Sequence, residues 1–355
     1  MRIGLITSWP LSLAEGSGTA VYVRAWLKAM RARGHEVLLY HYVSPFQSYA
    51  LQVLDRVRWN RYVLPRLLRR TGRPDRLVGL DWEGVFLDPG PELVVPLAIF
   101  ADIAPTEGGL NRWALRWQAQ LEARAVRRAP RVVAISQFAR ERIRLRYGRP
   151  EADIELIYPG LDHERWQRLL DQHAPRSRSQ PEILAVARLY PRKGIRYLLE
   201  AGAELNRRAL RWHMSIVGDG QQKAALRALA ERLGLGEQIT WAGAIEDRAQ
   251  LAGYFRSADV FCHPSVHETF GFVVLEAMAA GLPVVAARAA TMPELIADGQ
   301  TGLLVPPADA RALAEALERL LRDPQGARDL GQAARRRAGE FSWSKTAAAF
   351  EAILQ

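Results

Sequence analysis

The sequence contains a single cysteine, Cys262, and no long apolar run. One cysteine cannot build a disulfide framework or a cysteine metal site. The longest apolar run, residues 93–101, is far shorter than the roughly 18 residues that a membrane-spanning helix needs. Ile3–Ile6 is too short for the core of a signal peptide, and no small-residue cleavage site follows it. We therefore expect a cytoplasmic protein without disulfides.

Charge is distributed unevenly along the 355 residues. Residues 1–180 contain 28 Lys and Arg against 18 Asp and Glu, a net +10, whereas residues 181–355 contain 21 against 20, a net +1. A basic half favours an anionic partner such as a phosphorylated substrate or an acidic lipid surface. Arginines spread over solvated faces explain the same composition. Because no recognisable nucleic-acid module occurs in the basic half, we expect no nucleic-acid partner.

Two series of alternating strands and helices divide the chain. The first opens with a strand, a glycine loop, a helix and a strand, which together form a βαβ unit: Arg2–Thr7, the loop with Gly16 and Gly18, about Thr19 to Arg33, and Glu36–Tyr40. The second repeats this pattern with strands at Glu182–Ala187, His213–Val217, Ile239–Trp241 and Val260–Cys262, and helices at Gly194–Leu205, Gln222–Leu233 and Arg248–Ser257. We predict an α/β protein of two doubly wound, Rossmann-like domains that face a cleft.

The predicted domain boundaries follow from composition. The polar segment 172–181 is the best candidate for a linker. We accordingly place the N-terminal domain at 1–170, the linker at 171–181 and the C-terminal domain at 182–338. A terminal helix within 339–355 is expected to pack back toward the N-terminal domain.

The segment SVHETFGFVVLEAMAA, residues 265–280, combines two carboxylates with a helix start. A strand should end near His263, a short loop should carry Glu268, and a helix should begin around Phe270, with Glu276 about two turns along. Carboxylates accept hydrogen bonds from hydroxyl groups, so this spacing suits a sugar at one end and a ribose at the other. A surface glutamate pair on a core helix is the alternative.

The same segment should offer a site for an anion. Ligands of open α/β sheets bind beyond the carboxyl ends of the strands, where helix N-termini point. The helix dipole and the free backbone amides there attract an anion, and a glycine lets it approach the backbone closely. We expect these amides to come from Thr269, Phe270, Gly271 and Phe272.

Two cations, Arg188 and Lys193, follow the first strand of the second series. Five residues apart in a strand-to-helix loop, they can converge on a diphosphate, the arginine through its fork and the lysine as a point charge. Taken alone, they could equally be two solvated loop cations.

The frame of this second half resembles glycosyltransferase family 4. The resemblance is carried by ADVFCHPS (258–265), the E-x7-E pair, EAMAAGLPVV (276–285), Glu294 and GLLVPP (302–307). It implies that Glu276 holds the ribose of the nucleotide and that Glu268 lies beside the donor sugar. It also implies that Arg188 and Lys193 neutralise the donor diphosphate.

Several glycines fit the same resemblance. Gly218 and Gly243 occupy positions that line the nucleotide base in the family, and Gly16 and Gly18 resemble its glycine loop over the donor phosphates. Each of these glycines could also serve a simple tight turn.

The N-terminal domain departs from the family pattern. Many members place a catalytic-site histidine after a central strand, but residues 94–107 contain none, and Asp102 and Glu107 are the nearest polar candidates. Asp102 could replace the missing group as an acceptor for sugar hydroxyls, belong to the acceptor site, or be a solvated loop acid. The segment Asp81–Gly84 is also expected to face the acceptor.

Residues 51–76 contain eight arginines among aromatic and aliphatic side chains. Such a stretch could lie on an anionic membrane at the inner face and present a lipid-linked acceptor. Because Pro65 should interrupt any long helix, an ordinary solvated helix pair is the alternative.

The resulting expectation is a retaining glycosyltransferase with the two-Rossmann-domain (GT-B) fold. Its donor would be a UDP- or GDP-sugar, a co-substrate rather than a cofactor, and its acceptor a small molecule, a glycan or a lipid-linked hydroxyl. No metal is expected, because the cations take its place. The rival interpretations are a non-catalytic sugar-nucleotide-binding protein, a basic membrane or nucleic-acid module, and an epimerase on the same fold.

Overall fold

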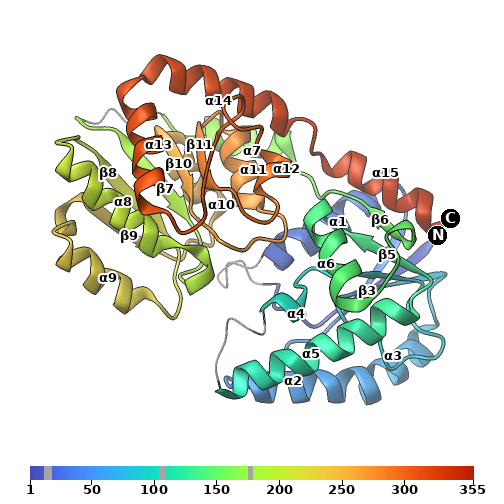
Figure 1. Ribbon diagram of the computed structural model, residues 1–355. Helices are drawn as coiled ribbons and strands as arrows, with labels where there is room; N and C mark the ends of the chain where they lie inside the picture. The colour runs from blue at the N-terminus through green and yellow to red at the C-terminus, as the bar shows by residue number, and fades with distance from the viewer. Residues whose placement is uncertain (12–17, 104–108, 175–178) are drawn as a thin grey trace. The chain divides into compact units, whose positions relative to one another are not determined.

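The computed structural model describes residues 1–11, 18–103, 109–174 and 179–355, and the chain divides into two compact units (Figure 1). The second unit is built on Leu161–Ser342, and the first comprises Met1–Leu11, Thr19–Gly160 and Trp343–Gln355. The chain therefore leaves the first unit and later returns to it for its last helix. Each unit contains a six-stranded parallel sheet, which confirms the predicted pair of doubly wound α/β domains.

The sheet of the first unit has the order β2-β1-β3-β4-β5-β6. Its central strand β1 is buried from Ile3 to Thr7, as expected for a parallel strand covered on both faces. The chain order reverses between β1 and β3, so the carboxyl ends of these two strands form the switch point at which such sheets bind ligands. The strands are β1 (Arg2–Thr7), β2 (Glu36–His41), β3 (Arg76–Leu80), β4 (Leu93–Val95), β5 (Arg131–Ala134) and β6 (Ile154–Leu156).

The helices of the first unit include the last helix of the chain. In α15, Trp343 packs edge-on against Tyr22, and Phe350 packs against Trp26, with ring centroids 5.4 and 5.8 Å apart. Both partners belong to α1, so these aromatic pairs fix α15 to the first unit. The helices are α1 (Gly18–Ala32), α2 (Tyr49–Arg58), the π-helix η1 (Trp59–Val63), α3 (Leu64–Thr71), α4 (Phe100–Ile103), α5 (Gly109–Arg128), α6 (Gln137–Tyr147), the 3₁₀ turn η3 (Glu151–Asp153) and α15 (Trp343–Leu354).

The prediction that Pro65 separates two helices is wrong. The chain stays helical from Tyr49 to Thr71, because a π turn directly precedes the proline. Leu64 N bonds to Trp59 O, five residues back, and Pro65 then falls in the first turn of α3, where a helix needs no amide hydrogen. The arginine-rich stretch is therefore one helical rod with a π segment in its middle.

The sheet of the second unit has the order β12-β11-β10-β7-β8-β9, with its switch point between β7 and β10. One face is packed by α8, α9 and α13, whose buried apolar side chains form a continuous core with the strands. The strands are β7 (Glu182–Val186), β8 (His213–Val217), β9 (Ile239–Gly243), β10 (Val260–His263), β11 (Val284–Ala287) and β12 (Leu303–Val305). The helices are α7 (His163–Asp171), η4 (Pro191–Lys193), α8 (Ile195–Arg207), α9 (Lys223–Arg232), η5 (Gly236–Gln238), α10 (Arg248–Ser257), α11 (Phe272–Ala279), α12 (Met292–Leu295), α13 (Ala310–Arg322) and α14 (Pro324–Ala338).

The boundary between the units lies earlier than the predicted one at residue 170. Helix α7 belongs to the second unit, because its Trp166 is buried there against Phe255, with ring centroids 5.3 Å apart. The two ends of the second unit lie side by side. Leu161 and Ser342 form a parallel bridge, and Leu161 N donates to Phe341 O over 3.1 Å.

The described residues contain neither a helix that could cross a bilayer nor a cluster of side chains that could hold a metal ion. Within them, every helix is too short or too polar to cross a bilayer. No group of three or more His, Cys, Asp or Glu side chains in the same ranges is arranged to hold a metal ion. Cys262 is buried on β10, and burial raises the pKa of its thiol, which keeps it unreactive.

Candidate active site

The switch point of the second sheet joins two loops that are far apart in sequence. β7 and β10 are adjacent parallel strands, and a backbone hydrogen bond of 2.9 Å connects Val266, after β10, to Arg192, after β7. Gly194 permits this approach, because its φ is +70° and a Cβ there would lie 2.1 Å from Pro264 O. The end of η4 therefore lies directly against the loop that follows β10.

Lys193 and Glu268 form an ion pair across these two loops. His263, at the end of β10, places Nε2 3.5 Å from Glu268 Oε2 and is almost completely buried. Burial alone would raise the pKa of Glu268, but the positive charge of Lys193 and the nearby His263 ring hold it well below its usual range. Burial lowers the pKa of His263. Glu268 is therefore a carboxylate at neutral pH, suited to accepting hydrogen bonds and not to donating a proton.

Arg188 differs from Lys193 in having no acidic partner. Its guanidinium lies over the ring of Tyr190, 5.1 Å from the centroid, and forms no ion pair within the part of the chain that the structure describes. The side chain is partly exposed in the loop after β7. It therefore provides an uncompensated positive charge at the switch point.

Thr291 holds the backbone of the loop that carries Glu268. This buried threonine donates its hydroxyl to Glu268 O and Thr269 O, over 3.0 and 2.9 Å. Gly271 follows in the left-handed region, with φ of +95°, and a Cβ there would lie 2.7 Å from Met292 Cε. Strain and lack of space both favour glycine at this position.

Helix α11 begins at Phe272, two residues later than predicted. The left-handed Gly271 cannot belong to an α-helix, so it serves as the N-cap, and no side chain caps the helix. Phe270 is buried against Phe272, with ring centroids 4.9 Å apart. Any contact of Thr269 to Phe272 with an anion is therefore expected to come from the backbone.

Glu276 lies on α11 and is held in place by two residues that the sequence did not reveal. Its Oε1 accepts a hydrogen bond of 2.7 Å from Arg248, and Trp166 donates to its backbone carbonyl over 3.0 Å. Arg248 in turn lies 4.9 Å over the Trp166 ring. Among the described residues, Oε2 of Glu276 has no donor, so one oxygen is anchored and the other can accept from a ligand.

Gly218 and Gly243 each have a local structural reason to be glycine. A Cβ on Gly218 would lie 1.9 Å from Ala187 O, because the chain after β8 passes directly beneath the loop that carries Arg188. Gly243 has a φ of +72° and open space around its Cβ position. Gly218 N donates to Gly243 O over 2.7 Å, so the two lie together at the ends of β8 and β9.

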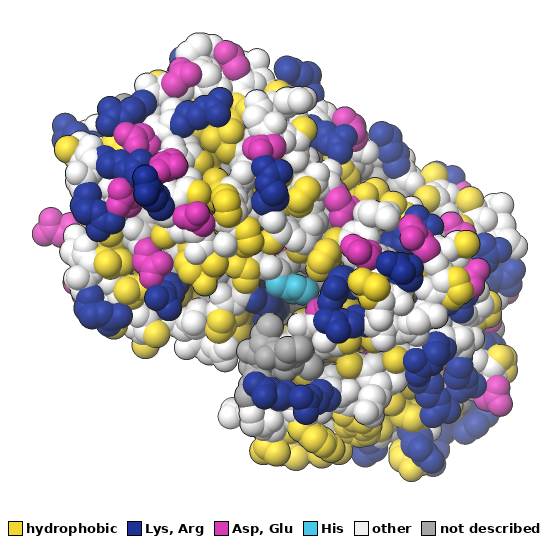
Figure 2. Space-filling model, in the orientation of Figure 1, with side chains coloured by type: hydrophobic (Ala, Val, Ile, Leu, Met, Phe, Trp, Pro, Cys, Tyr) yellow, Lys and Arg dark blue, Asp and Glu magenta, His cyan; other side chains and the backbone are white. Residues whose placement is uncertain are grey.

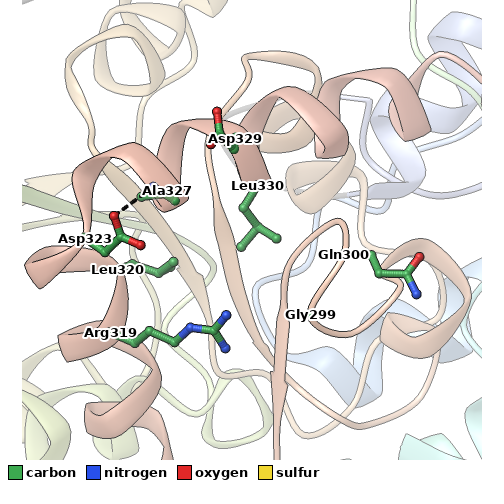
Figure 3. Close-up of a pocket in the computed structure, with 9 residues that line it drawn as sticks. Gly299, Gln300, Arg319, Leu320, Asp323, Ala327, Asp329 and Leu330 are labelled. Atoms are coloured by element: carbon green, nitrogen blue, oxygen red, sulfur yellow. Dashed lines mark hydrogen bonds between the residues drawn. The ribbon is translucent and has the colours of Figure 1, made fainter.

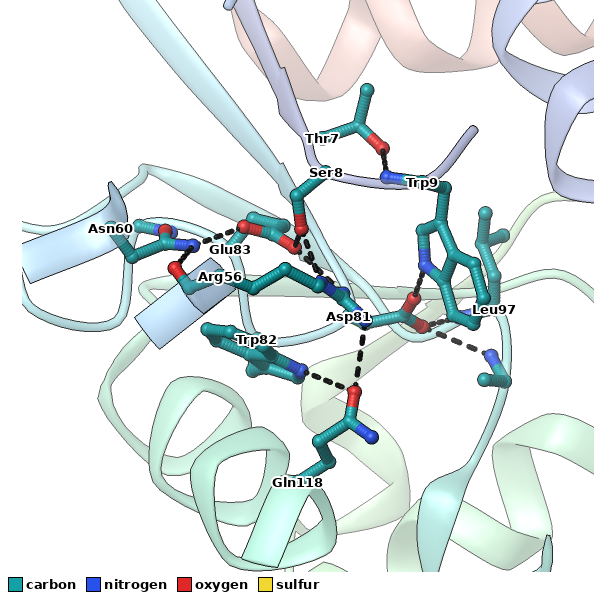
Figure 4. A network of polar contacts seen from close by, with 12 residues as sticks. Thr7, Ser8, Trp9, Arg56, Asn60, Asp81, Trp82, Glu83, Leu97 and Gln118 are labelled. Carbon is teal, nitrogen blue, oxygen red and sulfur yellow. Dashed lines mark hydrogen bonds and ion pairs between the residues drawn. The ribbon is translucent and has the colours of Figure 1, made fainter. Parts of the chain in front are cut away.

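The switch point of the first unit is filled by a buried polar network (Figure 4). Trp9, after β1, donates Nε1 to Asp81 Oδ2 over 2.6 Å, and Asp81 Oδ1 accepts from the backbone of Leu97 and Ala98, over 2.7 and 3.0 Å. Asp81 has a φ of +56°, which its three hydrogen bonds hold in place. It therefore fixes the loops after β1 and β4.

Arg56 forms the centre of this network. It donates to Glu83 over 2.9 Å and to Gln118 over 3.0 Å, and its guanidinium lies 4.9 Å from the rings of both Trp9 and Trp82. The prediction that Asp81–Gly84 faces the acceptor is wrong, because all four residues are buried. Their role is to hold the end of β3.

Of the three roles that the sequence left open for Asp102, the structure contradicts that of a solvated loop acid. Its carboxylate, on α4, is paired with Arg142 and Arg146 of α6, and only 6% of the side chain is exposed. Burial would raise its pKa, but the two arginines lower it below the usual range. The pair links α4 to α6. Gly16 and Glu107 lie outside the described residues, and Gly18 is the first residue of α1.

A second carboxyl group in the first unit, Glu122, carries a pH prediction. Burial and the charge of Asp81 raise its pKa well above the usual range, while its Oε2 accepts from Phe100 N over 2.9 Å and from the Tyr147 hydroxyl. The proton on Glu122 stabilises the fold fully below the unfolded pKa of about 4.3, and this stabilisation is lost as the pH rises through the folded pKa. We expect Glu122→Gln, which cannot ionise, to remove that loss in thermal unfolding measured from acid to alkaline pH. Parallel curves for the two proteins would contradict this assignment.

A pocket on the second unit contains none of these residues (Figure 3). It lies between the 299–300 turn and the α13–α14 region, and its lining includes Arg319, Asp323 and Asp329. The candidate site is therefore defined by the switch-point geometry and not by this hollow.

Comparison with known proteins identifies the family. Residues 168–337 match the model "Glycosyl transferases group 1", and residues 103–165 match "Glycosyltransferase Family 4". Over 283 residues, the chain is 34% identical to the GDP-mannose-dependent alpha-(1-6)-phosphatidylinositol monomannoside mannosyltransferase of Mycolicibacterium smegmatis, which covers 74% of each chain. The chain belongs to glycosyltransferase family 4.

Other relatives of this family 4 glycosyltransferase match over shorter spans. It is 35% identical over 242 residues to D-inositol 3-phosphate glycosyltransferase 2 of Catenulispora acidiphila, which covers 64% of this chain and 56% of that protein. Many of the curated relatives are thus matched over only about half of their length.

Solved structures show the same fold along the whole chain. Sucrose-phosphate synthase from Thermosynechococcus elongatus matches with a TM-score of 0.80 and 24% identity, covering 99% of this chain and 98% of that one. Anabaena HepE in complex with UDP and glucose matches with a TM-score of 0.76 and 20% identity, covering 100% and 99%. The predicted family, the GT-B fold and glycosyl transfer are confirmed.

Proposed function

We propose that this glycosyltransferase moves a hexosyl group from a nucleotide-diphosphate sugar to a hydroxyl acceptor, with retention of anomeric configuration and without a metal ion. The observation that carries the proposal is the second switch point. There the unpaired Arg188, the Lys193–Glu268 pair and the uncapped start of α11 lie at the carboxyl ends of adjacent strands. Cations and a helix N-terminus at such a position suit a diphosphate.

Each carboxylate then has a separate role. Glu276, with one oxygen held by Arg248, would accept hydrogen bonds from the ribose hydroxyls through the other. Glu268, ionised because of Lys193, would accept from hydroxyls of the donor sugar. Arg188 and Lys193 would stabilise the charge that develops on the departing diphosphate.

The proposed reaction breaks the bond between the anomeric carbon and the diphosphate oxygen. The acceptor hydroxyl oxygen forms the new bond from the same face, and its proton passes to the departing diphosphate oxygen. This route needs no general base on the protein, which agrees with a first unit whose Asp81, Glu83 and Asp102 are buried or paired. The positive charges that a metal would otherwise supply come from Arg188 and Lys193.

The relatives suggest where to look for substrates. One is named for GDP-mannose and a phosphatidylinositol monomannoside, another for inositol 3-phosphate, and a structural neighbour contains UDP. We propose a GDP- or UDP-hexose as donor and an acceptor in glycan, glycolipid or glycosylated-metabolite synthesis. The proposed location is the cytoplasm, peripheral to the inner face of the membrane.

The first test is a panel of GDP-, UDP- and ADP-sugars scored by thermal stabilisation and by slow release of the nucleotide. One donor should bind and be hydrolysed slowly. The substitution Glu276→Ala should weaken the binding of this donor by about 10- to 100-fold, because the carboxylate would no longer accept hydrogen bonds from the ribose. Isothermal titration with the nucleoside diphosphate alone measures this loss directly.

Glu231→Ala, on the exposed face of α9, is the matched control and should bind like the wild type. Activity that survives EDTA and a product with the anomeric configuration of the donor, read by NMR, would support the metal-free, retaining route. Binding without any turnover, even with acceptor mixtures, would favour the alternative of a non-catalytic sugar-nucleotide-binding protein. Binding by none of the donors would refute the proposed site.

A further inference from the structure

The first unit exposes apolar side chains that its own fold does not cover. All nine large hydrophobic residues that are exposed among the described residues belong to this unit. Five of them lie on α2, η1 and α5, and Phe46 comes shortly before α2. The five are Leu51, Leu54, Tyr62, Leu110 and Trp113, and between 46% and 74% of the surface of each residue is exposed.

These side chains form stripes on neighbouring helices. Leu110, Trp113 and Trp117 follow one another at helical spacing on α5, and the two indole rings lie 5.8 Å apart. α2 packs against α5, and Gln118 of α5 donates to the Tyr49 hydroxyl of α2 over 2.7 Å. Both helices run along the lower edge of the first unit in the view of Figure 1.

The charge around these stripes has a single sign. Helices α2, η1, α3 and α5 contain two acids, Asp55 and Glu122, and both are buried. The exposed charges on these helices are ten arginines: Arg58, Arg61, Arg66, Arg69, Arg70, Arg112, Arg116, Arg124, Arg127 and Arg128. Figure 2 shows yellow apolar side chains at this lower edge, with dark blue side chains on both sides of them. We call the exposed side chains of α2, η1, α3 and α5 the α2–α5 surface.

We propose that the α2–α5 surface docks this enzyme on an anionic lipid bilayer, with Leu51, Leu54, Leu110 and Trp113 entering the headgroup boundary. Apolar and aromatic side chains on one face of a helix, surrounded by cations and free of acids, are what interfacial binding requires. The arginines add electrostatic attraction to acidic headgroups and can stay at headgroup level while their stems lie on apolar surface. The inference deepens the proposed peripheral location, and the further step that this surface brings a lipid-linked acceptor to the enzyme rests on the proposed function.

The same features disfavour other partners. A second copy of the chain would bring ten arginines against ten, which repel one another in a symmetric interface. A nucleic acid would satisfy the arginines, but its phosphate backbone offers nothing to Leu51, Leu54 or Leu110. Not every arginine of residues 51–76 takes part, because Arg56 is buried in the polar network and Arg76 donates to the carbonyls of Leu354 and Gln355.

The test is co-sedimentation of the full chain with vesicles, which needs neither donor nor acceptor and so is independent of the proposed chemistry. Wild type should bind vesicles of equimolar phosphatidylcholine and phosphatidylglycerol at low salt, and should bind pure phosphatidylcholine far more weakly. Arg116→Gln with Arg124→Gln should weaken binding by about 25-fold, roughly fivefold for each basic residue. Leu110→Ser with Trp113→Ser should weaken it by about tenfold or more.

Two matched controls carry the same chemical changes elsewhere. Arg311→Gln with Arg328→Gln, on exposed helices of the second unit, and Leu145→Ser, on α6, should bind like the wild type. Unchanged melting temperatures would show that all variants fold. The proposal is overturned if the wild type does not co-sediment with anionic vesicles, or if both test variants bind these vesicles as tightly as the controls do. Tight binding to duplex DNA or RNA that survives the Leu110 and Trp113 changes, without vesicle binding, would assign the surface to nucleic acid instead.

Discussion

Replacing Lys193 with alanine should lower kcat/KM for the cognate donor by about 10²- to 10³-fold, the range found when one electrostatic donor to a developing charge is removed. The substitution has two effects. It removes the cation that we propose acts on the departing diphosphate, and it leaves the carboxylate of Glu268 without its ion-pair partner. Initial rates of nucleotide release across donor concentrations separate the loss in kcat from the change in KM.

Two variants make this expectation specific. Lys193→Arg keeps the charge and should retain much more activity than Lys193→Ala. Arg196→Ala, which removes an exposed cation three residues further along, should behave like the wild type. Wild-type rates in Lys193→Ala would show that the diphosphate binds elsewhere.

Replacing Arg56 with methionine should destabilise the first unit by about 3–5 kcal/mol, because it leaves Glu83 as a fully buried carboxylate without its cation. For a unit of this size, such a loss corresponds to a fall in melting temperature of about 10 °C. Intrinsic tryptophan fluorescence is a suitable signal for the thermal unfolding, because Trp9 and Trp82 flank the guanidinium of Arg56.

A double variant separates the stability lost with the packing of Arg56 from the stability lost because Glu83 remains as an unpaired buried charge. Arg56→Met combined with Glu83→Leu removes both charges and should recover part of the lost stability. Arg61→Met, at an exposed position on the same helical rod, should change the melting temperature little. An Arg56→Met protein that melts within about 2 °C of wild type would contradict the role given to this residue.

The sequence predicted best what depends on local periodicity. In the sequence, buried parallel strands are short apolar runs, and helices show apolar residues at helical spacing that end at a glycine. The elements β1, α1, β8 and α10 accordingly lie within about two residues of their predicted bounds. The order of strands in each sheet could not be derived in this way, because register and neighbours are set by tertiary packing. The sequence placed α7 in the first domain, since nothing local shows that Trp166 is buried in the core of the second.

Which side chains pair with each other was harder to predict than which residues lie near the site. The structure places Arg188, Lys193 and Glu268 in the loops after β7 and β10, and Glu276 lies on α11, but their roles remain predictions. The pairing of Lys193 with Glu268 joins residues 75 positions apart, and no local pattern encodes it. Asp102 illustrates the opposite failure, because an acid in a loop-like segment looks free until the fold brings Arg142 and Arg146 to it.

Thr291 and Arg248 left no signal in the sequence that we could use. Both act through a neighbour, Thr291 through the backbone of Glu268 and Arg248 through the carboxylate of Glu276. Residues of this kind become visible only when three-dimensional contacts are known.

The bridge between Leu161 and Ser342 has a consequence for how this architecture can change. Topologically, the second unit is an insertion within the first, and its entry and exit lie next to each other. A segment with adjacent ends can be exchanged for another of the same kind while the host sheet, closed by α15, keeps its own core. The second unit, which carries the proposed diphosphate site, can therefore diversify by recombination at a single pair of joints while the first unit keeps its own core.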